Sequence, residues 1–386
     1  MSDRGGRPAW IEIDHAAIRH NLARLRSLVP PATSVIGVVK ANAYGHGDVE
    51  VARTLLGEGV ERLAVATVAE GIALREAGIG GPLLVLWAIG AGELDGALAA
   101  DLELLLHRST DVAAFGDAAR RTGRHVAVHL KVDSGLGRQG IEPGAAIELA
   151  TTAARDPEID LVGTFSHLAV PGEDDAYTDM QLLRFARALD GMRSAGVDPG
   201  IVHVSASGGI LAGAGTFADA IRPGLALYGM VPASVADRDP GLIPALTLKA
   251  LPLRIFDLPA GEAIGYGLRF RAARATRIAT LGIGYGDGWP RSHINNGWAL
   301  VRGVRVPMVG AVSMDGITVD VGEVPDVTYD DEFVLSGEQI GARITADEVA
   351  AERRTINYEV TTALRRRLPR VHLGERQERE RTHQAG

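Results

Sequence analysis

A lysine that could form a Schiff base stands at the end of a predicted buried strand. The segment TSVIGVVKANAYGHG, residues 33–47, opens with the β-branched and apolar residues typical of such a strand, and Lys40 follows them directly. Burial disfavours the ammonium form and lowers the pKa of a lysine. Only the neutral amine attacks a carbonyl, so this position favours a Schiff-base lysine. From these residues alone, a solvated lysine at a strand end remains an equal alternative.

The motif VVKANAYGHG resembles the pyridoxal-phosphate lysine motif of the alanine racemases. The resemblance runs from about residue 9 to residue 374 and includes KVDSGLGRQG, VHVSASGG, IRPGLALYG and INYEVTTAL in the family's order. It implies pyridoxal 5′-phosphate as the cofactor and Lys40 as the lysine that carries it. It also implies a two-base racemisation of an amino acid, with Lys40 as one of the two bases.

The phosphate of such a cofactor needs backbone N–H groups and hydroxyls around it. The glycine-bearing turn RPGLALYG could supply N–H groups from Gly224 and Leu225, although most turns of this kind are only turns. The resemblance implies that the phosphate is bound by Tyr44, Ser207, Gly224, Leu225 and Tyr358. Where the family usually has Asn-Ser, this chain has Ala206 and Ser207, so we expect rearranged hydrogen bonds near the phosphate.

Arg222 follows the last strand of the repeating pattern described below, and we expect it at the same end of the fold as Lys40. The resemblance implies that Arg222 donates to the pyridine nitrogen of the cofactor and that His167 bonds this arginine. An arginine keeps its proton, so the ring nitrogen would stay unprotonated and the cofactor would be a weaker electron sink. From the residues alone, a surface arginine and a core histidine are the alternatives.

Racemisation requires a base on each face of the substrate α-carbon. In AIGYGLRF, flanking glycines leave the hydroxyl of Tyr266 accessible, although a Gly-Tyr-Gly segment is usually only a turn. The resemblance implies that Tyr266 is the second base and acts in the site of the other subunit. Its pKa would have to fall below the usual value of about 10, and His167 and Arg222 are the expected cause.

Further residues with implied roles lie in KVDSGLGRQG, GAVSMDG and IGYGDGW. The resemblance implies that Arg138 binds both the phenolic oxygen of the cofactor and the substrate carboxylate. Lys131 matches a lysine that is often carbamylated, and an unmodified lysine is an equal alternative. Met314 and Asp315 would face the substrate of the partner, and Tyr285 would line the way into the site.

The elements that position these residues alternate regularly through the first part of the chain. From Val35, eight predicted strands alternate with helices over about 195 residues, a pattern typical of a (β/α)8 barrel. The predicted helices lie at 48–59, 69–78, 92–100, 109–122, 143–155 and 177–195. Active sites of such barrels lie at the carboxyl ends of the strands. That end receives Lys40, Lys131 with Arg138, His167, Ser207 and Arg222.

After about residue 240 the pattern changes to short strands separated by Gly, Pro and Asp, with helices only near 345–352 and 357–366. We therefore predict a barrel at 9–242 and a mostly β domain at 243–375, with residues 1–13 a tail and strand associated with the second domain. The C-terminal charge run RRRLPRVHLGERQERERTH is interpreted as a solvated helix end and tail, disordered at 376–386.

Composition narrows the class of protein. A chain of 386 residues with 46% hydrophobic and 23% charged residues is typical of a globular protein of two domains. Its net charge of −8, with dispersed basic residues, does not indicate a nucleic-acid partner. We expect no membrane span, no signal peptide and a cytoplasmic location. No cysteine is present, and no cluster of metal ligands is predicted.

The predicted function is a pyridoxal-phosphate-dependent racemase that interconverts L- and D-alanine for peptidoglycan synthesis, as a homodimer with shared active sites. A serine or broad-specificity racemase is an alternative, since a hydroxyl or methylene changes binding by only ~1–3 kcal/mol. A non-catalytic carrier of the cofactor is a second alternative, although relatives of that kind lack the second domain. A decarboxylase of the related type would need an acidic partner for the ring nitrogen, where this chain has Arg222.

Overall fold

The computed structural model describes residues 6–238 and 240–374. They fall into two compact units, which are Arg19–Ile243 and the combination of residues up to Ile18 with those from Pro244 onward. The predicted disordered tail at 376–386 lies outside the described residues.

The first unit is a barrel of eight parallel strands in the order β4-β3-β2-β9-β8-β7-β6-β5. The two ends of this order, β4 and the segment at β5, are joined by backbone hydrogen bonds of 2.9 Å from Val85 N to Glu103 O and from Glu103 N to Leu83 O, which close the ring. The predicted (β/α)8 barrel is thus confirmed. Its strands are β2 (Ser34–Val38), β3 (Arg62–Val65), β4 (Leu83–Val85), β5 (Leu104–Leu106), β6 (Val126–Lys131), β7 (Ile159–Phe165), β8 (Ile201–Ala206) and β9 (Ala220–Arg222).

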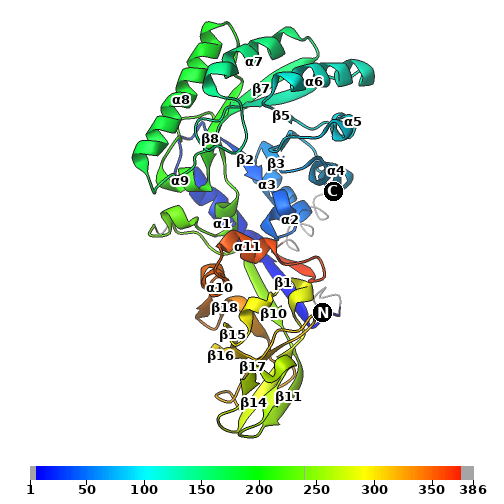
Figure 1. Ribbon diagram of the computed structural model, residues 1–386, viewed down its shortest axis with the longest axis vertical. Coiled ribbons are helices and arrows are strands. Elements are labelled where there is room, and N and C mark those ends of the chain that lie inside the picture. The colour runs from blue at the N-terminus through cyan, green and yellow to red at the C-terminus, as the bar shows by residue number, and fades with distance from the viewer. Residues whose placement is uncertain (1–5, 239, 375–386) are drawn as a thin grey trace, which may run out of the picture. The chain divides into compact units, whose positions relative to one another are not determined.

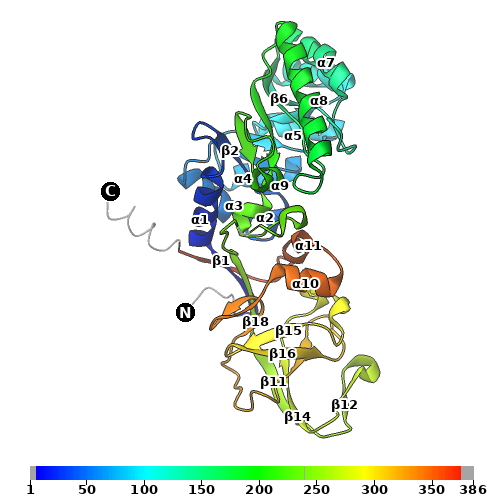
Figure 2. The same ribbon diagram turned by 90° about the vertical axis from the view of Figure 1, so that its left-hand side faces the viewer.

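Helices follow the strands and form the outside of the barrel, as α6, α7 and α8 do beside β5, β7 and β8 in Figure 1 and as α7 and α8 do beside β6 in Figure 2. Local signals start several of them: Thr67 and Glu70 form a capping box at α4, and Asp174 caps α8. The helices are α1 (His15–Arg26), α2 (Lys40–Tyr44), α3 (Asp48–Gly57), α4 (Val68–Glu76), α5 (Leu94–Ala99), α6 (Ser109–Thr122), α7 (Pro143–Arg155), α8 (Asp175–Ser194) and α9 (Ser207–Ala212).

The second unit is mostly β, as predicted. Its main sheet has the path β11-β14-β17-β16-β15-β18-β10-β1-β20, with β19 paired to β18. The strands are β1 (Ala9–Asp14), β10 (Leu246–Ala250), β11 (Pro252–Leu258), β12 (Ala263–Ile264), β13 (Phe270–Arg271), β14 (Thr276–Leu281), β15 (Trp298–Val301), β16 (Val304–Val309), β17 (Ile317–Asp320), β18 (Phe333–Gln339), β19 (Ala342–Ile344) and β20 (Arg370–Leu373). The helices are α10 (Ala346–Arg353) and α11 (Asn357–Thr362).

The interpretation of the C-terminal charge run as a helix end and tail is wrong for four of its residues. Arg370–Leu373 form β20, which pairs in parallel with β1, from Ile11↔Arg370 to Asp14↔Leu373. The pairing joins segments about 360 residues apart in the chain, so no local pattern could indicate it. The N-terminal strand β1 therefore belongs to the main sheet of the second unit, between β10 and β20.

Candidate active site

Lys40 opens a left-handed turn directly after the first barrel strand. Strand β2 ends at Val38, two residues earlier than predicted, and residues 41–44 all have positive φ, between 51° and 57°. Left-handed conformations cost a residue with a side chain roughly 1–2 kcal/mol each, so such a run persists only where its surroundings hold it. The Glu70 carboxylate supplies one restraint, because it accepts the N–H of Ala41 at 2.7 Å and the N–H of Ala66 at 2.8 Å. The turn fixes where the Lys40 side chain begins.

The surroundings of Lys40 favour its neutral amine. Burial lowers the pKa of Lys40, and the charges of Arg138 and Arg222 lower it further, while Glu70 acts in the opposite direction. His167 belongs to the same group: burial, followed by the charges of Arg222, Arg138, Lys131 and Lys40, holds its pKa well below the usual value. The structure therefore gathers these residues at the carboxyl ends of the strands, as the barrel pattern predicted.

Arg222 ends β9 and is almost fully buried, with 3% of its surface exposed. Its NH1 donates to His203 Nδ1 at 2.8 Å, and its NH2 donates to the carbonyls of Ser166 and Val204 and to His167 Nδ1 at 3.3 Å. Burial and the charge of Arg138 lower the pKa of Arg222 to about 9. Among the described residues, its Nε has no hydrogen-bond partner, so this N–H remains available to a ligand.

A preformed set of donors lies around Ser207 and Gly224. The Ser207 hydroxyl oxygen accepts the N–H groups of Gly224 and Ala226, both at 3.1 Å. Leu225 begins a 3-10 turn, Leu225–Tyr228, so its N–H has no partner within that turn. A Cβ on Gly224 would lie 2.4 Å from the Tyr44 hydroxyl, so the absence of a side chain at Gly224 admits this hydroxyl. The group offers N–H and O–H donors of the kind that bind a phosphate.

Ala206, the departure from the family pattern, caps the short helix α9 without a side-chain hydrogen bond. An asparagine there could accept an N–H of the first turn. Here Ser207, with 4% of its surface exposed, is the only one of the two residues with a side chain that can bond. The chain thus keeps the serine of the family pattern, which accepts the N–H groups of Gly224 and Ala226, and lacks the amide that an asparagine would add.

Lys131 is the last residue of β6, and Arg138 lies in the loop that follows this strand. Burial, followed by the charges of Arg138 and Arg222, lowers the pKa of Lys131 to about 8. The guanidinium carbon of Arg138 lies 5.5 Å from the centre of the Trp87 ring, a cation–π arrangement, and it has no hydrogen bond or ion pair within the described part of the chain. Arg138 thus presents its donors to a ligand. Trp87, which is 47% exposed, was not predicted as a site residue.

Tyr266 lies at the tip of a hairpin in the second unit. Strands β12 and β13 pair through Ala263↔Arg271 and Ile264↔Phe270, and the latter two side chains pack on a buried apolar cluster. The flanking glycines, Gly265 and Gly267, have φ values of 74° and 69° that residues with a side chain adopt only at a cost. Tyr266 itself is 71% exposed, which leaves its hydroxyl accessible to another molecule.

Two neighbouring loops of the second unit hold Tyr285 and Met314 together. The N–H of Tyr285 donates to Ser313 O at 3.0 Å, and the N–H of Gly286 donates to Met314 O at 2.8 Å. The Met314 side chain is 53% exposed. These bonds make one surface from two segments that are about 30 residues apart in the chain.

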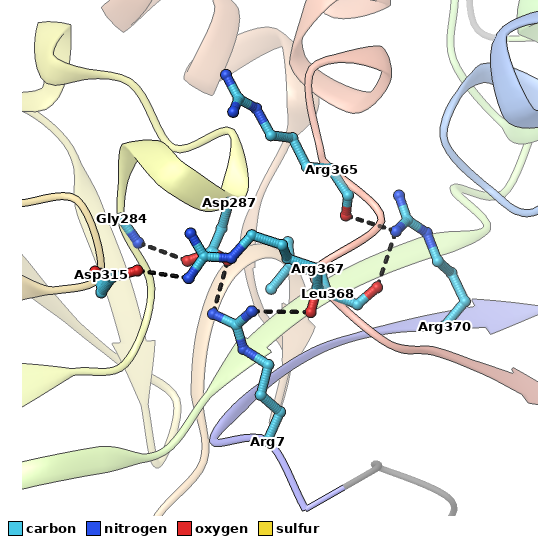
Figure 3. Close-up of polar contacts among 8 residues, drawn as sticks. All are labelled: Arg7, Gly284, Asp287, Asp315, Arg365, Arg367, Leu368 and Arg370. Atoms are coloured by element: carbon cyan, nitrogen blue, oxygen red, sulfur yellow. Dashed lines mark hydrogen bonds and ion pairs between the residues drawn. The ribbon is translucent and has the colours of Figure 1, made fainter.

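A buried carboxylate anchors these loops (Figure 3). Asp287 is fully buried; it accepts Arg7 NH2 at 2.7 Å and Gly284 N at 3.1 Å, and Arg367 Nε lies 3.4 Å away. Arg367 also pairs with the exposed carboxylate of Asp315. Asp315, a predicted substrate-facing residue, thus already has a cationic partner in its own subunit.

Tyr358 lies on α11 of the same unit, and burial raises its pKa. The residues predicted from the sequence therefore lie in both units. Their pattern did not indicate Glu70 or the buried His203. A histidine within the otherwise apolar start of β8, IVHV, is the sequence signal that could have found His203.

Comparisons with known proteins cover nearly the whole chain. The family model "Alanine racemase, N-terminal domain" matches residues 13–232, and "Alanine racemase, C-terminal domain" matches residues 245–372. A curated alanine racemase of Symbiobacterium thermophilum is 40% identical over 372 residues, with 96% of this chain and 98% of the relative covered.

Solved structures agree with these matches. An alanine racemase of Clostridium difficile 630 superposes with a TM-score of 0.90 at 34% identity, covering 95% of this chain and 96% of the other. A histidine racemase of Leuconostoc mesenteroides superposes with a TM-score of 0.87 at 26% identity, covering 96% and 99%. The same fold is therefore found with two different named substrates.

Proposed function

This chain belongs to the alanine racemase family, and from this membership we propose that it is an isomerase that interconverts L- and D-alanine with pyridoxal 5′-phosphate as cofactor. The observation that carries the proposal is the group around Lys40. A largely buried amine with a lowered pKa lies among Arg138 and Arg222, and Arg222 keeps one N–H without a partner among the described residues. An amine that is neutral more often is a better nucleophile towards a carbonyl.

The residues present fit the cofactor. Lys40 would carry it, Arg222 Nε would donate to its ring nitrogen, and the phosphate would be bound by Ser207, Gly224, Leu225 and the hydroxyls of Tyr44 and Tyr358. When bound, the cofactor supplies a conjugated ring that spreads the negative charge developing at the substrate α-carbon. With a pKa of about 9, Arg222 is still charged at neutral pH and keeps its proton, so the ring nitrogen would remain unprotonated. This limits side reactions that need a strong electron sink.

Two bases are needed, one for each face of the α-carbon. We propose Lys40 for one face and Tyr266 of the partner subunit for the other, so the active protein would be a homodimer with shared sites. Support comes from the high exposure of Tyr266 on a hairpin anchored by Ile264 and Phe270. Arg138 would bind the substrate carboxylate with its guanidinium, which has no ion pair within residues 6–238 and 240–374, while Tyr285, Met314 and Asp315 would border the substrate of the partner.

Carbamylation of Lys131 is part of the proposal. Its pKa of about 8 leaves roughly a tenth of the amine neutral at pH 7, enough for Nζ to form an N–C bond with carbon dioxide as a proton leaves. The product is an anion beside the guanidinium of Arg138, whose charge is one cause of the lowered pKa of Lys131. The modification would replace a repulsion between two cations by an attraction.

No helix of the described residues is long and apolar enough to cross a membrane. The predicted cytoplasmic location, and the use of D-alanine in peptidoglycan, stay predictions that follow from the proposed activity. Serine and broader specificity remain the alternatives in substrate. The histidine racemase with the same fold gives a reason to include histidine in the substrate test.

The test combines cofactor attachment with product analysis. Purified protein loaded with pyridoxal 5′-phosphate should show a visible absorption band that borohydride abolishes, and L-alanine should be converted towards an equal mixture of enantiomers. The chain has only three lysines, Lys40, Lys131 and Lys249, so peptide mapping after reduction should find the cofactor on Lys40 alone.

Lys249→Met is the matched control, because Lys249 is paired with Glu12 and Glu332 at 2.9 Å and has no proposed role in the reaction. It should keep both the band and the activity, whereas Lys40→Ala should lose both. Cofactor on Lys40 with no racemisation of alanine, serine or histidine would favour the non-catalytic carrier instead.

A second experiment addresses the shared site. Lys40→Ala and Tyr266→Ala chains, each inactive alone, should recover activity when mixed, because a hybrid dimer contains one intact site. Absence of recovery despite demonstrated subunit exchange would contradict a site built from two chains.

A further inference from the structure

A continuous chain of polar side chains crosses the interior of the barrel unit. Each member is hydrogen-bonded to the next, and the last one is the arginine assigned above to the cofactor nitrogen. We call this chain the barrel relay, and its members in order are Arg62, Glu103, His129, His203 and Arg222.

The distances along the relay are those of good hydrogen bonds. Arg62 donates twice to the Glu103 carboxylate, at 2.8 and 2.9 Å, and His129 Nε2 lies 3.0 Å from the same carboxylate. His129 Nδ1 lies 2.9 Å from His203 Nε2, and Arg222 NH1 lies 2.8 Å from His203 Nδ1.

The two ends of the relay belong to opposite ends of the barrel. Arg62 is the first residue of β3 and Glu103 precedes β5, whereas Arg222 is the last residue of β9. Because the barrel strands are parallel, their first residues share one end and their last residues share the other. The relay therefore connects the end of the barrel that faces away from Lys40 with the end that carries Lys40.

The chemistry of the two ends leaves one arrangement of protons between them. Arg222 can only donate, so His203 Nδ1 must accept and His203, which is neutral, must carry its proton on Nε2. That proton points at His129 Nδ1, which must accept in turn, and His129 therefore carries its proton on Nε2. This proton meets the Glu103 carboxylate, which can only accept.

The charge states agree with this arrangement. Burial, followed by the charge of Arg222, holds the pKa of His203 well below its usual value, and burial lowers the pKa of His129 as well. Although burial alone would raise it, hydrogen bonds from His129 and Arg62 hold the pKa of Glu103 below its usual value. Both histidines are thus neutral and the carboxylate is ionised.

Packing holds the two rings in place. Phe165 stacks on His203 with ring centres 4.8 Å apart and planes within 6°, and it meets His129 edge-on. A Cβ on Gly163 would lie 2.3 Å from His129 Nδ1, so only a glycine at this position of β7 admits the ring. Both histidines have no exposed surface.

We propose that Glu103 is a positioning residue for the reaction at the far end of the barrel: it fixes the tautomers of His129 and His203 so that Arg222 is held with its Nε directed at the cofactor. This inference rests on the proposed function for its effect on catalysis. The tautomers themselves follow from the relay alone. Without a carboxylate at position 103, only Arg222 still selects this order of protons. The reversed order, which sets an N–H of His203 against an N–H of Arg222, is then no longer opposed at the other end of the relay, where it also sets an unprotonated His129 Nε2 against the Glu103 carboxylate.

The direct test is the protonation of the two rings in the unmodified protein. Nitrogen chemical shifts of ¹⁵N-histidine-labelled protein, with and without cofactor, should show both rings as neutral Nε2–H tautomers from about pH 6 to pH 8. His129→Gln and His203→Gln variants would assign the two signals among the eleven histidines. An Nδ1–H tautomer or a protonated ring at either position would overturn the proposal.

The second test replaces Glu103 by an amide of the same shape. If the amide of the new glutamine presents its oxygen to His129, its NH₂ group faces the N–H groups of Arg62. If it presents its NH₂ group to His129 instead, His129 must accept this hydrogen bond and the tautomers of both histidines are reversed. With Glu103→Gln we expect a mixed tautomer signal, a changed visible band of the bound cofactor and a kcat lowered by about tenfold or more, since small displacements at a site have effects up to about 10². KM for alanine should change less, because Arg138 and not Arg222 is proposed to bind the carboxylate.

Glu61→Gln is the matched control, since Glu61 is exposed, precedes Arg62 and accepts the Ser34 hydroxyl at 2.9 Å. It should leave the tautomers, the band and kcat unchanged. Unchanged tautomers and kcat in Glu103→Gln, or an equal loss in Glu61→Gln, would overturn the proposal. Wild-type protein with the expected tautomers but no bound cofactor and no racemisation would instead overturn the proposed function and leave the tautomer assignment supported.

Discussion

At the scale of single residues, the site brings several cationic groups together, and their mutual repulsion and burial outweigh the effect of the carboxylates near them. Lys40, Lys131 and Arg222 all have lowered pKa values, and in each case burial is the largest cause and the charge of Arg138 is the next. Such an arrangement destabilises the folded protein slightly and provides binding energy for an anionic ligand. A cofactor with a phosphate and a substrate with a carboxylate are ligands of that kind.

The pKa of Lys131 leads to a prediction about stability and pH. The value is about 8 in the folded protein and about 10.5 when unfolded, so the unfolded chain binds more protons between these pH values. The destabilising effect of Lys131 is therefore complete below pH 8 and disappears as the pH rises towards 10.5. Lys131→Met should raise the melting temperature of the cofactor-free protein by roughly 1–3 °C at pH 7.

The difference in melting temperature between Lys131→Met and the wild type should shrink at higher pH. Thermal unfolding in buffers free of carbon dioxide measures this difference. Measuring the difference between variant and wild type at each pH removes the titration of all other groups. A difference that stays constant or grows from pH 7 to pH 10 would contradict the lowered pKa.

At the scale of elements, backbone shape decides where the site can form. The left-handed turn of α2 places Tyr44 beside Gly224, and the closeness of the two depends on the missing side chain. Gly224→Ala would put a Cβ 2.4 Å from the Tyr44 hydroxyl, so one of the two segments must move. We expect at least about tenfold weaker binding of the cofactor, measured by fluorescence titration of the cofactor-free protein.

Gly144→Ala is the control, because a Cβ there meets nothing within 4 Å and the residue lies in the first turn of α7. Its effect on cofactor binding should be negligible. Equal affinities of the two variants would show that the Tyr44 contact does not contribute to binding.

The loops that carry Tyr285 and Met314 depend on a different element, the buried carboxylate of Asp287 (Figure 3). Asp287→Asn removes the charge that pairs with Arg7 and Arg367. Because both arginines are partly exposed, we expect a loss of about 1–3 kcal/mol rather than that of a fully buried pair. Thermal unfolding and KM for alanine would both detect the loosened loops.

Asp315→Asn is the comparison for this variant, since the Asp315 carboxylate is exposed and, among the residues that the structure describes, pairs with Arg367 alone. It should lower stability by less than about 1 kcal/mol. If Asp315→Asn were the more destabilising of the two, Asp287 would not be the anchor of these loops.

At the scale of the whole molecule, the two units supply complementary groups. In the proposed function the barrel would provide the lysine and the donors for the cofactor, and the second unit would provide the exposed Tyr266 and the loops with Tyr285 and Met314. If each site takes its second base from the partner, the active species is the dimer.

Specific activity should therefore fall on dilution, in parallel with the fraction of dimer measured by sedimentation. Tyr266→Phe should show the same dimer fraction as wild type with at least about a hundredfold lower kcat, since it lacks a base that contributes about 10²–10⁴. Full activity in a range where sedimentation shows only monomers would contradict a shared site.

The sequence determined the class of fold and the family, and it predicted the residues of the candidate site. Alternating strands and helices are a local property, because the period of apolar residues decides which segments are strands and the number of repeats closes the barrel. The positions of Lys40, Lys131, His167 and Arg222 at strand ends follow from the same pattern, since parallel strands end on one side. No contact between distant segments is needed for these conclusions.

Only the tertiary structure decided which groups touch. The partners of Arg222 lie on β8 and in the loop after β7, and their distances depend on how these separate segments pack together. The relay from Arg62 to Arg222 joins five barrel segments, and β20 pairs with β1 from the other end of the sequence. Register and long-range pairing arise from the packing of all strands together, which no local pattern records.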